Sequence, residues 1–336
     1  MHNIDLKKYE IRTDMAIDLA EKNDKLYKQN NYIKDNINVS WITLDEKNNI
    51  GKKKGTYLTL EFSDITDDDA KKKVSQVFEE ELNKMLLLKG YNKSKKVTVI
   101  GLGNVRSTPD ALGPFVSDKI IATKHFFDMN IDVDKNFSNV STFYPGVTGQ
   151  TGIETSDFVK GVVKEIKPDM LIIVDALASS SISRVNKSIQ VSDSGISPGS
   201  GIGNKRKEIS KDTIGMPVIV IGVPTVVDAA VIVKDTINYM MQNYAYNKKI
   251  QKSKMTKFIN KPINYLGKDI DIGEDDKKNL LGLIGTLNSD ELLNLTYEVL
   301  TPIGYNLMVT PKEVDFIIEK LSDIISYGIN HVLHNL

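Results

Sequence analysis

Residues 97–114 read VTVIGLGNVRSTPDALGP, and this stretch decides the fold. The opening VTVI is apolar or β-branched throughout and predicts a short buried strand. The glycines, Asn104 and Pro109 that follow predict an irregular loop, which presents Asp110 just before a helix. A strand that leads through a loop into a helix is the first half of a βαβ unit.

Short apolar runs and segments of helical periodicity alternate outward from this stretch. The apolar runs predict strands at 97–100, 139–143, 170–174, 188–191 and 217–223. The helical segments cover 112–129, 155–166 and 227–244. This alternation is typical of βαβ units, so we expect an α/β protein with a mostly parallel central sheet flanked by helices.

The two ends of the chain have other patterns. Residues 38–44 and 56–62 predict an antiparallel pair within an N-terminal β-hairpin extension at about 33–63. A helix should follow from Thr66, its expected N-cap, to Gly90, and a weaker helical pattern lies at 15–24. The C-terminal part, about 274–336, is expected to be helical, with helices at 274–287, 289–300 and 311–333.

The composition excludes several classes of protein. The 336 residues include 44 Lys and Arg and 44 Asp and Glu, so the net charge of zero favours neither a nucleic-acid nor a membrane partner. The absence of cysteine excludes disulfides, thiolate nucleophiles and cysteine-ligated metals. The N-terminus does not read as a signal peptide and the apolar runs are too short to span a membrane, so we expect a cytoplasmic protein.

Two aspartates stand where a parallel sheet binds its ligands. Asp110 follows the strand at 97–100 and Asp175 follows the strand at 170–174, and ligands bind beyond the carboxyl ends of such strands. Two carboxylates in a dry cleft do not both ionise easily, so one keeps a proton and the pair can serve as base and acid for attack of water on a carbonyl. A structural role for each, as a helix cap or a ligand of loop amides, is the alternative.

Other motifs point to chemistry less strongly. GLG at 101–103 begins like a dinucleotide fingerprint, but Arg106 occupies the position of the third glycine. SDSG at 192–195 resembles the Asp-Ser-Gly of aspartic proteases, whose all-β fold does not match this pattern. GISPG at 195–199 has the form of a nucleophile elbow, and PGSGIGNKRKE at 198–208 predicts a flexible loop near the site. We therefore regard Asn104, Gly199, Gly201 and Gly203 as possible residues of the site loops.

A conventional histidine-rich metal site is hard to build from this sequence. Its histidines are His2, His125, His331 and His334, of which only the last two are close together. Any metal would be bound mostly by carboxylates. The same scarcity disfavours a serine hydrolase, because only the two C-terminal histidines follow Ser197 in the expected order.

Longer blocks of sequence are more specific than any single motif. They read GLGNVRSTPDALGP, YPGVTGQTGIETSD, VDALAS, SDSGISPGSGIGNKRKEIS, IGVPTVVDA and NLMVTPKEVD, in this order. Together these blocks resemble the germination protease family of spore-forming Firmicutes. The resemblance runs from about Tyr9 to the C-terminus.

The resemblance implies a fold, an activity and a substrate. The fold is similar to that of the hydrogenase maturation endopeptidases, and the family is described as tetrameric, so a homotetramer is expected. The activity is that of an atypical aspartic endopeptidase, a hydrolase with Asp110 and Asp175 as its catalytic pair and no cofactor or metal. The substrates are small acid-soluble spore proteins, degraded during spore germination, which implies a place in the cytoplasm of the forespore or spore core without direct nucleic-acid or membrane partners.

The resemblance also implies a zymogen that removes its own propeptide by autocatalytic cleavage. The cleaved bond should follow an acidic residue and precede a hydrophobic residue and an alanine, as in the substrates. IRTDMA at 11–16 has this order and points to the bond between Asp14 and Met15. We therefore expect a propeptide at 1–14 and a single α/β peptidase domain at 15–336.

Two rival hypotheses remain beside the aspartate pair. The first is a carboxylate-metal-dependent peptidase of the maturation type, although the histidine that those enzymes use as a further ligand has no obvious equivalent in this sequence. The second is a non-catalytic binding protein that keeps the fold. The presence of both Asp110 and Asp175 counts against it.

Overall fold

The computed structural model describes residues 13–20, 27–46, 48, 52–199, 207–252, 273–300 and 307–336. The chain divides into two compact units, and the larger comprises Arg12–Val227 and Thr310–Leu336. The smaller unit contains Asp228–Val309. The single domain expected over 15–336 stays a prediction, as does the propeptide at 1–14, most of which lies outside the described residues.

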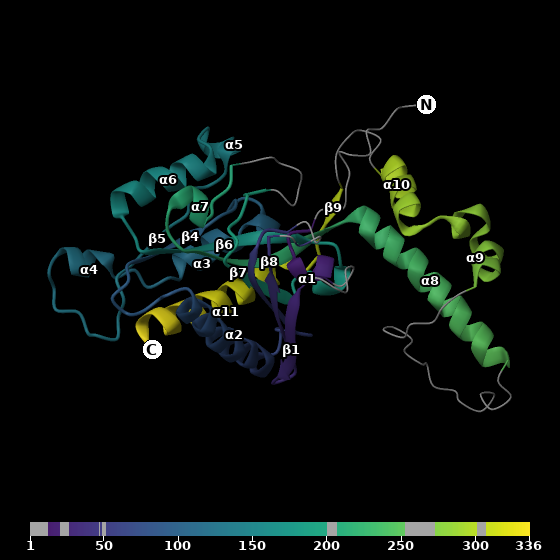
Figure 1. Cartoon of the computed structure of the whole chain (residues 1–336), viewed down its shortest axis with the longest axis horizontal. Coiled ribbons are helices and arrows are strands. Elements are labelled where there is room, and N and C mark those ends of the chain that lie inside the picture. Colours follow the sequence, from purple (N-terminus) through teal and green to yellow (C-terminus); the bar gives the residue numbers. More distant parts are fainter. Residues whose placement is uncertain are drawn as a thin grey trace. The chain divides into compact units, whose positions relative to one another are not determined.

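One sheet runs through the larger unit, with α2 and α11 on one side and α6 and α7 on the other (Figure 1). Its strands follow the order β1-β2-β3-β7-β8-β6-β4-β5. Their bounds are β1 Lys28–Lys34, β2 Ile37–Leu44, β3 Gly55–Glu61, β4 Val97–Gly101, β5 Val140–Phe143, β6 Met170–Ser179, β7 Ser188–Ser192 and β8 Val218–Asp228.

The expected α/β class is confirmed, and the sheet has two halves. β5, β4, β6 and β8 pair in parallel, whereas β8, β7, β3, β2 and β1 pair antiparallel. Of the five strands predicted for the central sheet, β5, β4, β6 and β8 are parallel and β7 is antiparallel, so the expectation of a mostly parallel central sheet is confirmed. The predicted hairpin forms as β2 and β3, and because β3 pairs with β7 it continues the central sheet.

The edge strand β1 was not predicted from the sequence. Its residues, KQNNYIK, are mostly exposed, so they lack the alternation of buried and exposed positions that indicates a strand. The signal lies instead in the turn that joins β1 to β2, where Asp35 and Asn36 have φ values of 50° and 65°. Positive φ at both positions is typical of two-residue hairpin turns.

The helices of the larger unit are α1 Ala16–Ala20, α2 Asp68–Leu88, α3 Leu112–Asp118, α4 Lys124–Asp128, α5 Thr148–Thr151, α6 Thr155–Ile166, α7 Lys211–Ile214 and α11 Val314–His334. The smaller unit contains α8 Ala229–Lys252, α9 Glu274–Leu281, the 3₁₀ helix Gly282–Thr286, α10 Ser289–Leu300 and the short strand β9 Met308–Val309. None of the described helices is long and apolar enough to cross a membrane.

Two helix predictions need correction. The N-cap of α2 is Asp67, whose carboxylate accepts the Ala70 N–H, because the Thr66 hydroxyl donates to Asp64 instead. The helix predicted at 112–129 breaks into α3 and α4. The first part ends at Asp118, and Thr123, the N-cap of α4, donates its N–H to the carbonyl of Val140 at 2.9 Å, which ties this stretch to β5. A tertiary hydrogen bond here overrides helical periodicity.

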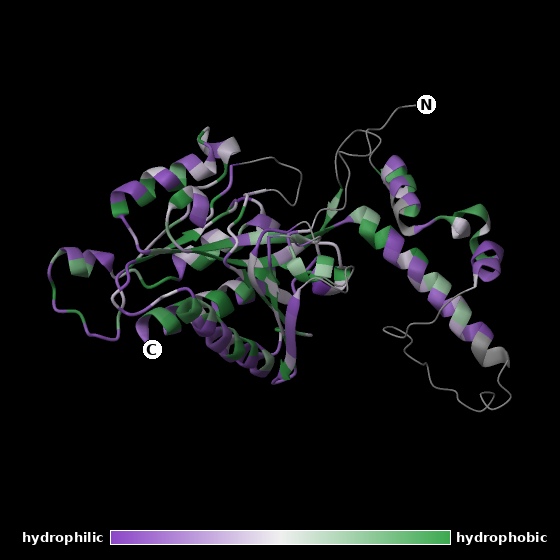
Figure 2. Ribbon diagram, in the orientation of Figure 1, coloured by the Kyte–Doolittle hydropathy of each residue, from purple (hydrophilic) through white to green (hydrophobic). Residues whose placement is uncertain are grey.

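The core lies on both faces of the sheet. On one face, α2, α3 and α11 cover strand residues such as Val99, Ile172 and Ile221. On the other, α6 covers Ile173 and Val220, and hydrophobic and hydrophilic residues alternate along this helix (Figure 2). The strands of the parallel half are therefore buried on both faces, which is the usual state of parallel sheets.

The pairing register aligns three positions across the middle of the sheet. Gly222 in β8 pairs with Asp175 in β6 on one side and with Gln190 in β7 on the other. Directly paired residues point to the same face of a sheet, so the Asp175 and Gln190 side chains share a face, with only a glycine between them. A Cβ added at Gly222 would lie 2.4 Å from a methyl carbon of Leu177.

The absence of a side chain at Gly222 should therefore be a requirement of the fold. Gly222→Ala is expected to lower the free energy of unfolding by about 1–3 kcal/mol, because overpacking forces neighbouring side chains aside. Urea unfolding midpoints measure the effect, and adding Leu177→Ala to the same chain should recover part of the loss.

Gly161 in α6 provides the matched control, since no atom lies within 4 Å of a Cβ added there. Gly161→Ala should leave stability unchanged or raise it by about 0.5–1 kcal/mol through helix propensity. A Gly222→Ala protein as stable as the unsubstituted chain would contradict the account of this register.

Candidate active site

Asp175 lies inside β6 and not beyond its end. The strand continues to Ser179 because Ala176 and Leu177 go on pairing with β8, so the sequence-based strand end at 174 is wrong by five residues. The Asp175 side chain is only 6% exposed, and its carboxyl accepts the N–H of Ala176 at 2.9 Å.

The surroundings of Asp175 favour its protonated form. Burial raises the pKa of this carboxyl well above its usual value, and the charges on Asp110 and Asp14 raise it further, in that order. The hydrogen bond from Ala176 opposes these effects but is the smallest of them. Asp175 is therefore an acid that keeps its proton far above the pH at which an exposed aspartate loses it.

The loop after β4 holds Asp110 where its charge acts on Asp175. Asp110 closes the 3₁₀ helix Thr108–Asp110, and its carbonyl accepts the N–H of Asn104 at 2.8 Å. The Thr225 hydroxyl of β8 donates to the carbonyl of Pro109 at 2.6 Å, which ties the loop to the sheet. Gly103 has a φ of 124°, and a Cβ there would lie 2.0 Å from the Asp110 carbonyl oxygen, so only glycine fits.

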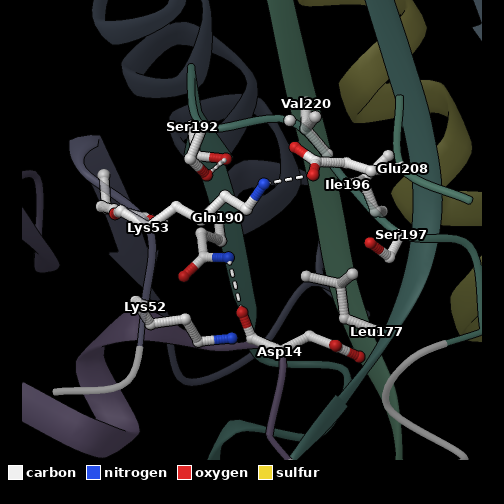
Figure 3. A pocket seen from close by; sticks show the side chains of 13 residues that line it. Asp14, Lys52, Lys53, Leu177, Gln190, Ser192, Ile196, Ser197, Glu208 and Val220 are labelled. Carbon is white, nitrogen blue, oxygen red and sulfur yellow. Dashed lines mark hydrogen bonds and ion pairs between the residues drawn. The ribbon is translucent and has the colours of Figure 1, made fainter. Parts of the chain in front are cut away.

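The third carboxylate of this group belongs to the N-terminal segment. Asp14 donates its N–H to the carbonyl of Ala178 at 2.9 Å, and its carboxylate accepts the Ala178 N–H at 3.0 Å. Its own carbonyl accepts the side-chain amide of Gln190 at 3.1 Å, as Figure 3 shows. The segment around the predicted cleavage position is thus bonded both to β6, through Ala178, and to β7, through Gln190. The Gln190 side chain extends from the face of the sheet that carries Asp175.

The residues after Asp14 are anchored by apolar packing. Met15 and Ala16 are fully buried and pack with Ile42, Leu44 and Tyr57 of the hairpin. The predicted helix at 15–24 is present as α1 Ala16–Ala20, and residues 21–24 lie outside the described residues. The side after the predicted cleavage position therefore holds a hydrophobic residue followed by an alanine in dry surroundings.

A buried ion-pair network adds a polar anchor. Asp18 is 2% exposed and bonds to the Arg184 guanidinium at 2.7 Å, while Arg184 also bonds to Glu61 at 2.7 Å. The Ser180 N–H and the Thr13 hydroxyl donate to the same Asp18 carboxylate, at 2.7 Å and 2.6 Å. Both oxygens of the Asp18 carboxylate thus have hydrogen-bond donors. The bonds tie Thr13, before the predicted cleavage position, and Asp18, after it, to the same place.

A cavity of about 180 Å³ opens beside the segment. Its lining includes Asp14, Lys52, Gln190, Ser197 and Glu208, several of which point into it in Figure 3. The Lys52 ammonium donates to the carbonyl of Thr13 at 2.9 Å. Burial lowers the pKa of Lys52, and the charges on Asp14 and Asp18 act in the opposite direction.

The cavity lining does not include Asp110 or Asp175. Asp14 is the residue common to the cavity and to the carboxylate group, since it lines the first and raises the pKa of Asp175 in the second. We locate the candidate site by the carboxylate group, because a cavity shows only where there is room.

The remaining candidates from the sequence lie apart or have structural partners. Asp193 accepts the N–H of Thr56 at 2.6 Å and pairs with Lys89, so it joins β3 to β7. Asn104 accepts the Arg106 N–H and shapes the Asp110 loop. Gly199 has a φ of 73° and forms a turn, whereas Gly201 and Gly203 lie outside the described residues.

The described histidines have partners outside this site. His334 bonds to the carbonyl of Ile121, and His331 stacks on Tyr327. Ser197 lines the cavity, but no histidine contact to it is present among the described residues. Within the described ranges, no group of three or more His, Asp and Glu side chains is arranged to hold a metal ion.

Gln190 and Lys52 are site residues that sequence reasoning missed. Gln190 stands between apolar neighbours in SIQVS, and a polar side chain inside a buried strand is a signal that sequence reasoning could have used. Lys52 lies between β2 and β3 and has no such signal, because lysine is common in exposed loops.

A protonated carboxyl, a neighbouring carboxylate and a firmly held peptide segment make up the chemistry of this site. Such a pair can take a proton from water and give one to a leaving nitrogen. The charge that acts on Asp175 together with that of Asp110 belongs to Asp14, the residue before the predicted cleavage position.

Comparison with known proteins gives consistent matches over nearly the whole chain. Residues 6–336 match the germination protease family. The chain is 42% identical over 351 residues to a germination protease of Bacillus cereus, covering 99% of this chain and 96% of the relative. It is 43% identical over 352 residues to a germination protease of Bacillus licheniformis, covering 98% and 95%. Among solved structures, it is similar to a nickel–iron hydrogenase maturation protease from Thermococcus kodakarensis, with a TM-score of 0.27 and 14% identity over 43% of this chain and 80% of that one.

The raised pKa of Asp175 predicts how stability changes with pH. The folded chain binds more protons than the unfolded chain between the unfolded pKa, about 3.9, and the higher folded pKa, so stability falls as pH rises through this window. Asp175→Asn has no such proton to lose. Near neutral pH it should unfold at a higher urea concentration than the unsubstituted chain, and below pH ~3.9 at the same concentration. Within the window, its advantage in the free energy of unfolding should grow by about 1.4 kcal/mol for each pH unit.

Asp64 provides a control of opposite sign. Hydrogen bonds from Thr66 lower the pKa of this exposed carboxylate, so Asp64→Asn should lose stability near neutral pH. Equal urea midpoints for Asp175→Asn and the unsubstituted chain at every pH would refute the account of the buried acid.

Proposed function

The chain belongs to the germination protease family and is a protease, and we propose that Asp110 and Asp175 activate water to cut its own bond between Asp14 and Met15. One observation carries the proposal: the charges on both Asp110 and Asp14 raise the pKa of the buried Asp175 carboxyl. Electrostatic coupling weakens with distance, so it supports a site in which the two aspartates and the residue before the expected bond lie near one another.

The proposed division of roles follows from the two environments. Asp175 is buried and holds a proton, which makes it the acid that protonates the leaving nitrogen of Met15. Asp110 is half-buried on a loop and acts as the base that takes a proton from water. The pair would thus work as one unit, with a single proton between two carboxyl groups.

The zymogen proposal rests on where the N-terminal segment lies. Residues 13–16 take up the hydrogen bonds of Ala178 in β6 and Gln190 in β7. In this proposal a substrate strand would need the same bonds. A tethered segment has a high effective concentration, so an uncut chain excludes other substrates. Cutting after Asp14 would separate residues 1–14 from the rest and allow them to leave.

The substrate proposal rests on the surroundings of the same segment. Met15 and Ala16 are buried in the apolar cluster of the hairpin, which suits a hydrophobic residue and then an alanine after the cut bond. Small acid-soluble spore proteins with an acidic residue before such a pair are the substrates implied by the family resemblance. We propose accordingly that the enzyme starts their degradation in the spore core during germination, as a homotetramer.

A carboxylate-metal peptidase is the alternative activity. Carboxylate oxygens are the ligands that a hard cation prefers, but Asp110, Asp175 and Asp14 are not arranged to hold one among the described residues. Chelator treatment followed by metal replacement separates the two mechanisms, because an aspartate pair needs no added cation. A binding protein without activity would show no cleavage under any of these conditions.

Loss of either aspartate should abolish self-cleavage. Asp110→Ala and Asp175→Ala should each slow cutting by at least about 10³-fold, and the double substitution should be hardly worse, because base and acid act as a unit. Mass spectrometry of the purified chains should find a new N-terminus at Met15 in the unsubstituted protein and an intact N-terminus in all three variants.

Asp193→Asn is the matched control, since Asp193 also follows a buried strand but has structural partners. It should mature normally. Maturation of either single alanine variant at the normal rate would disprove the assignment, and failure of Asp193→Asn alone would move the chemistry to the SDSG segment.

A further inference from the structure

The amide of Gln190 lies directly against the bond that the proposed function assigns as the cut bond. We propose that Gln190 is a further catalytic residue, whose side-chain N–H donates to the carbonyl oxygen of Asp14 and stabilises the negative charge that forms there. The inference rests on the proposed function, because it takes the Asp14–Met15 bond as the reacting one.

Gln190 makes two hydrogen bonds that bracket this bond. Its Nε2 donates to the carbonyl oxygen of Asp14 at 3.1 Å, and its Oε1 accepts the N–H of Ala16 at 2.7 Å. The partners fix the orientation of the amide, since a carbonyl oxygen only accepts and a backbone N–H only donates. The amide N–H therefore faces the oxygen of the reacting carbonyl.

The sheet register holds Gln190 on the same side as the carboxyl pair. Asp175 and Gln190 both pair with Gly222, so their side chains extend from the same face on either side of a glycine, over which Leu177 packs. Asp14 lies between the two strands, bound to Ala178 in β6 through its N–H and to Gln190 through its carbonyl. The segment is thus held from two strands, by Gln190 of β7 and by Ala178 of β6, the strand that also carries Asp175.

Burial makes the donor effective. Gln190 is 6% exposed and sits in the middle of a rigid strand. A fixed donor in surroundings that exclude water stabilises a developing oxyanion more than a donor in water does, and removing one such donor typically slows catalysis by about 10²–10³-fold.

The proposed step balances as follows. The oxygen of water bonds to the carbonyl carbon of Asp14, one water proton passes to Asp110, and the carbonyl electron pair moves to the oxygen that faces Gln190. When this oxyanion reforms its double bond, the bond to the Met15 nitrogen breaks and the nitrogen takes the proton of Asp175. Asp14 gains a carboxyl group, Met15 gains a free amine, and the proton on Asp110 returns to Asp175.

Lys52 is the neighbouring donor with a different task. Its ammonium donates to the carbonyl of Thr13, one residue before the reacting carbonyl. The charge on the Thr13 oxygen does not change during the reaction, so this bond contributes to holding the segment. Only the bond from Gln190 strengthens as charge develops.

Two substitutions of Gln190 in the full-length chain test the inference. Gln190→Glu keeps an acceptor for the Ala16 N–H and removes the donor to the Asp14 carbonyl, whereas Gln190→Met removes both without adding charge. The first readout is the first-order rate of cutting at Asp14–Met15, divided by the folded fraction that circular dichroism measures. The second is kcat and KM of the matured enzyme on a peptide with the sequence of residues 11–18. Gln29→Met, on the exposed edge strand β1, is the matched control and should keep the normal rates.

Both Gln190 variants should lose about 10²–10³-fold in rate and in kcat, with a smaller change in KM. A Gln190→Glu protein that cuts within about threefold of the normal rate, or a loss confined to KM, would overturn the inference and leave Gln190 as a residue that only holds the segment. Asp175→Asn is measured in parallel. If it cuts normally, the proposed function itself fails, and if it is inactive while Gln190→Glu is active, only the role of Gln190 fails.

Discussion

The Asp175 carboxyl is buried inside a strand and faces the negative charges of Asp110 and Asp14. An ionised carboxylate in such a place would cost several kcal/mol, so the fold favours the protonated form. The like charges act in the same direction as burial and add to the cost of ionising Asp175. The proposed chemistry depends on it, because the leaving nitrogen of a peptide bond needs an acid that still holds its proton.

The rest of the site serves to bring groups to this carboxyl from separate parts of the chain. Gly222 of β8 leaves room for the Leu177 side chain between Asp175 and Gln190, and Gly103 lets the loop after β4 close tightly on Asp110. The N-terminal segment is held by backbone bonds to Ala178 and by the buried pair of Asp18 and Arg184. These devices fix the geometry of the site at some cost in stability, which is common where function needs buried polar groups.

Sequence reasoning found the parts of this arrangement that depend on local patterns. The alternation of apolar runs and helical segments gave the parallel half of the sheet, and the ends of those runs gave Asp110 and Asp175. It missed β1, because an exposed edge strand has no burial pattern, and it predicted one helix at 112–129 where α3 and α4 are separate, because Thr123 is held by a distant strand. Gln190 and Lys52 depend on pairing register and loop position, which no single segment encodes.

The most direct test of the account is an NMR titration of the Asp175 carboxyl carbon in the chain with and without Asp110→Asn. The account predicts a raised pKa for Asp175 in the unsubstituted chain and a lower one in the variant, still above the value of an exposed aspartate because burial remains. An Asp175 pKa that does not change when the charge of Asp110 is removed would show that the two carboxyl groups do not interact. That result would contradict the proposed catalytic pair.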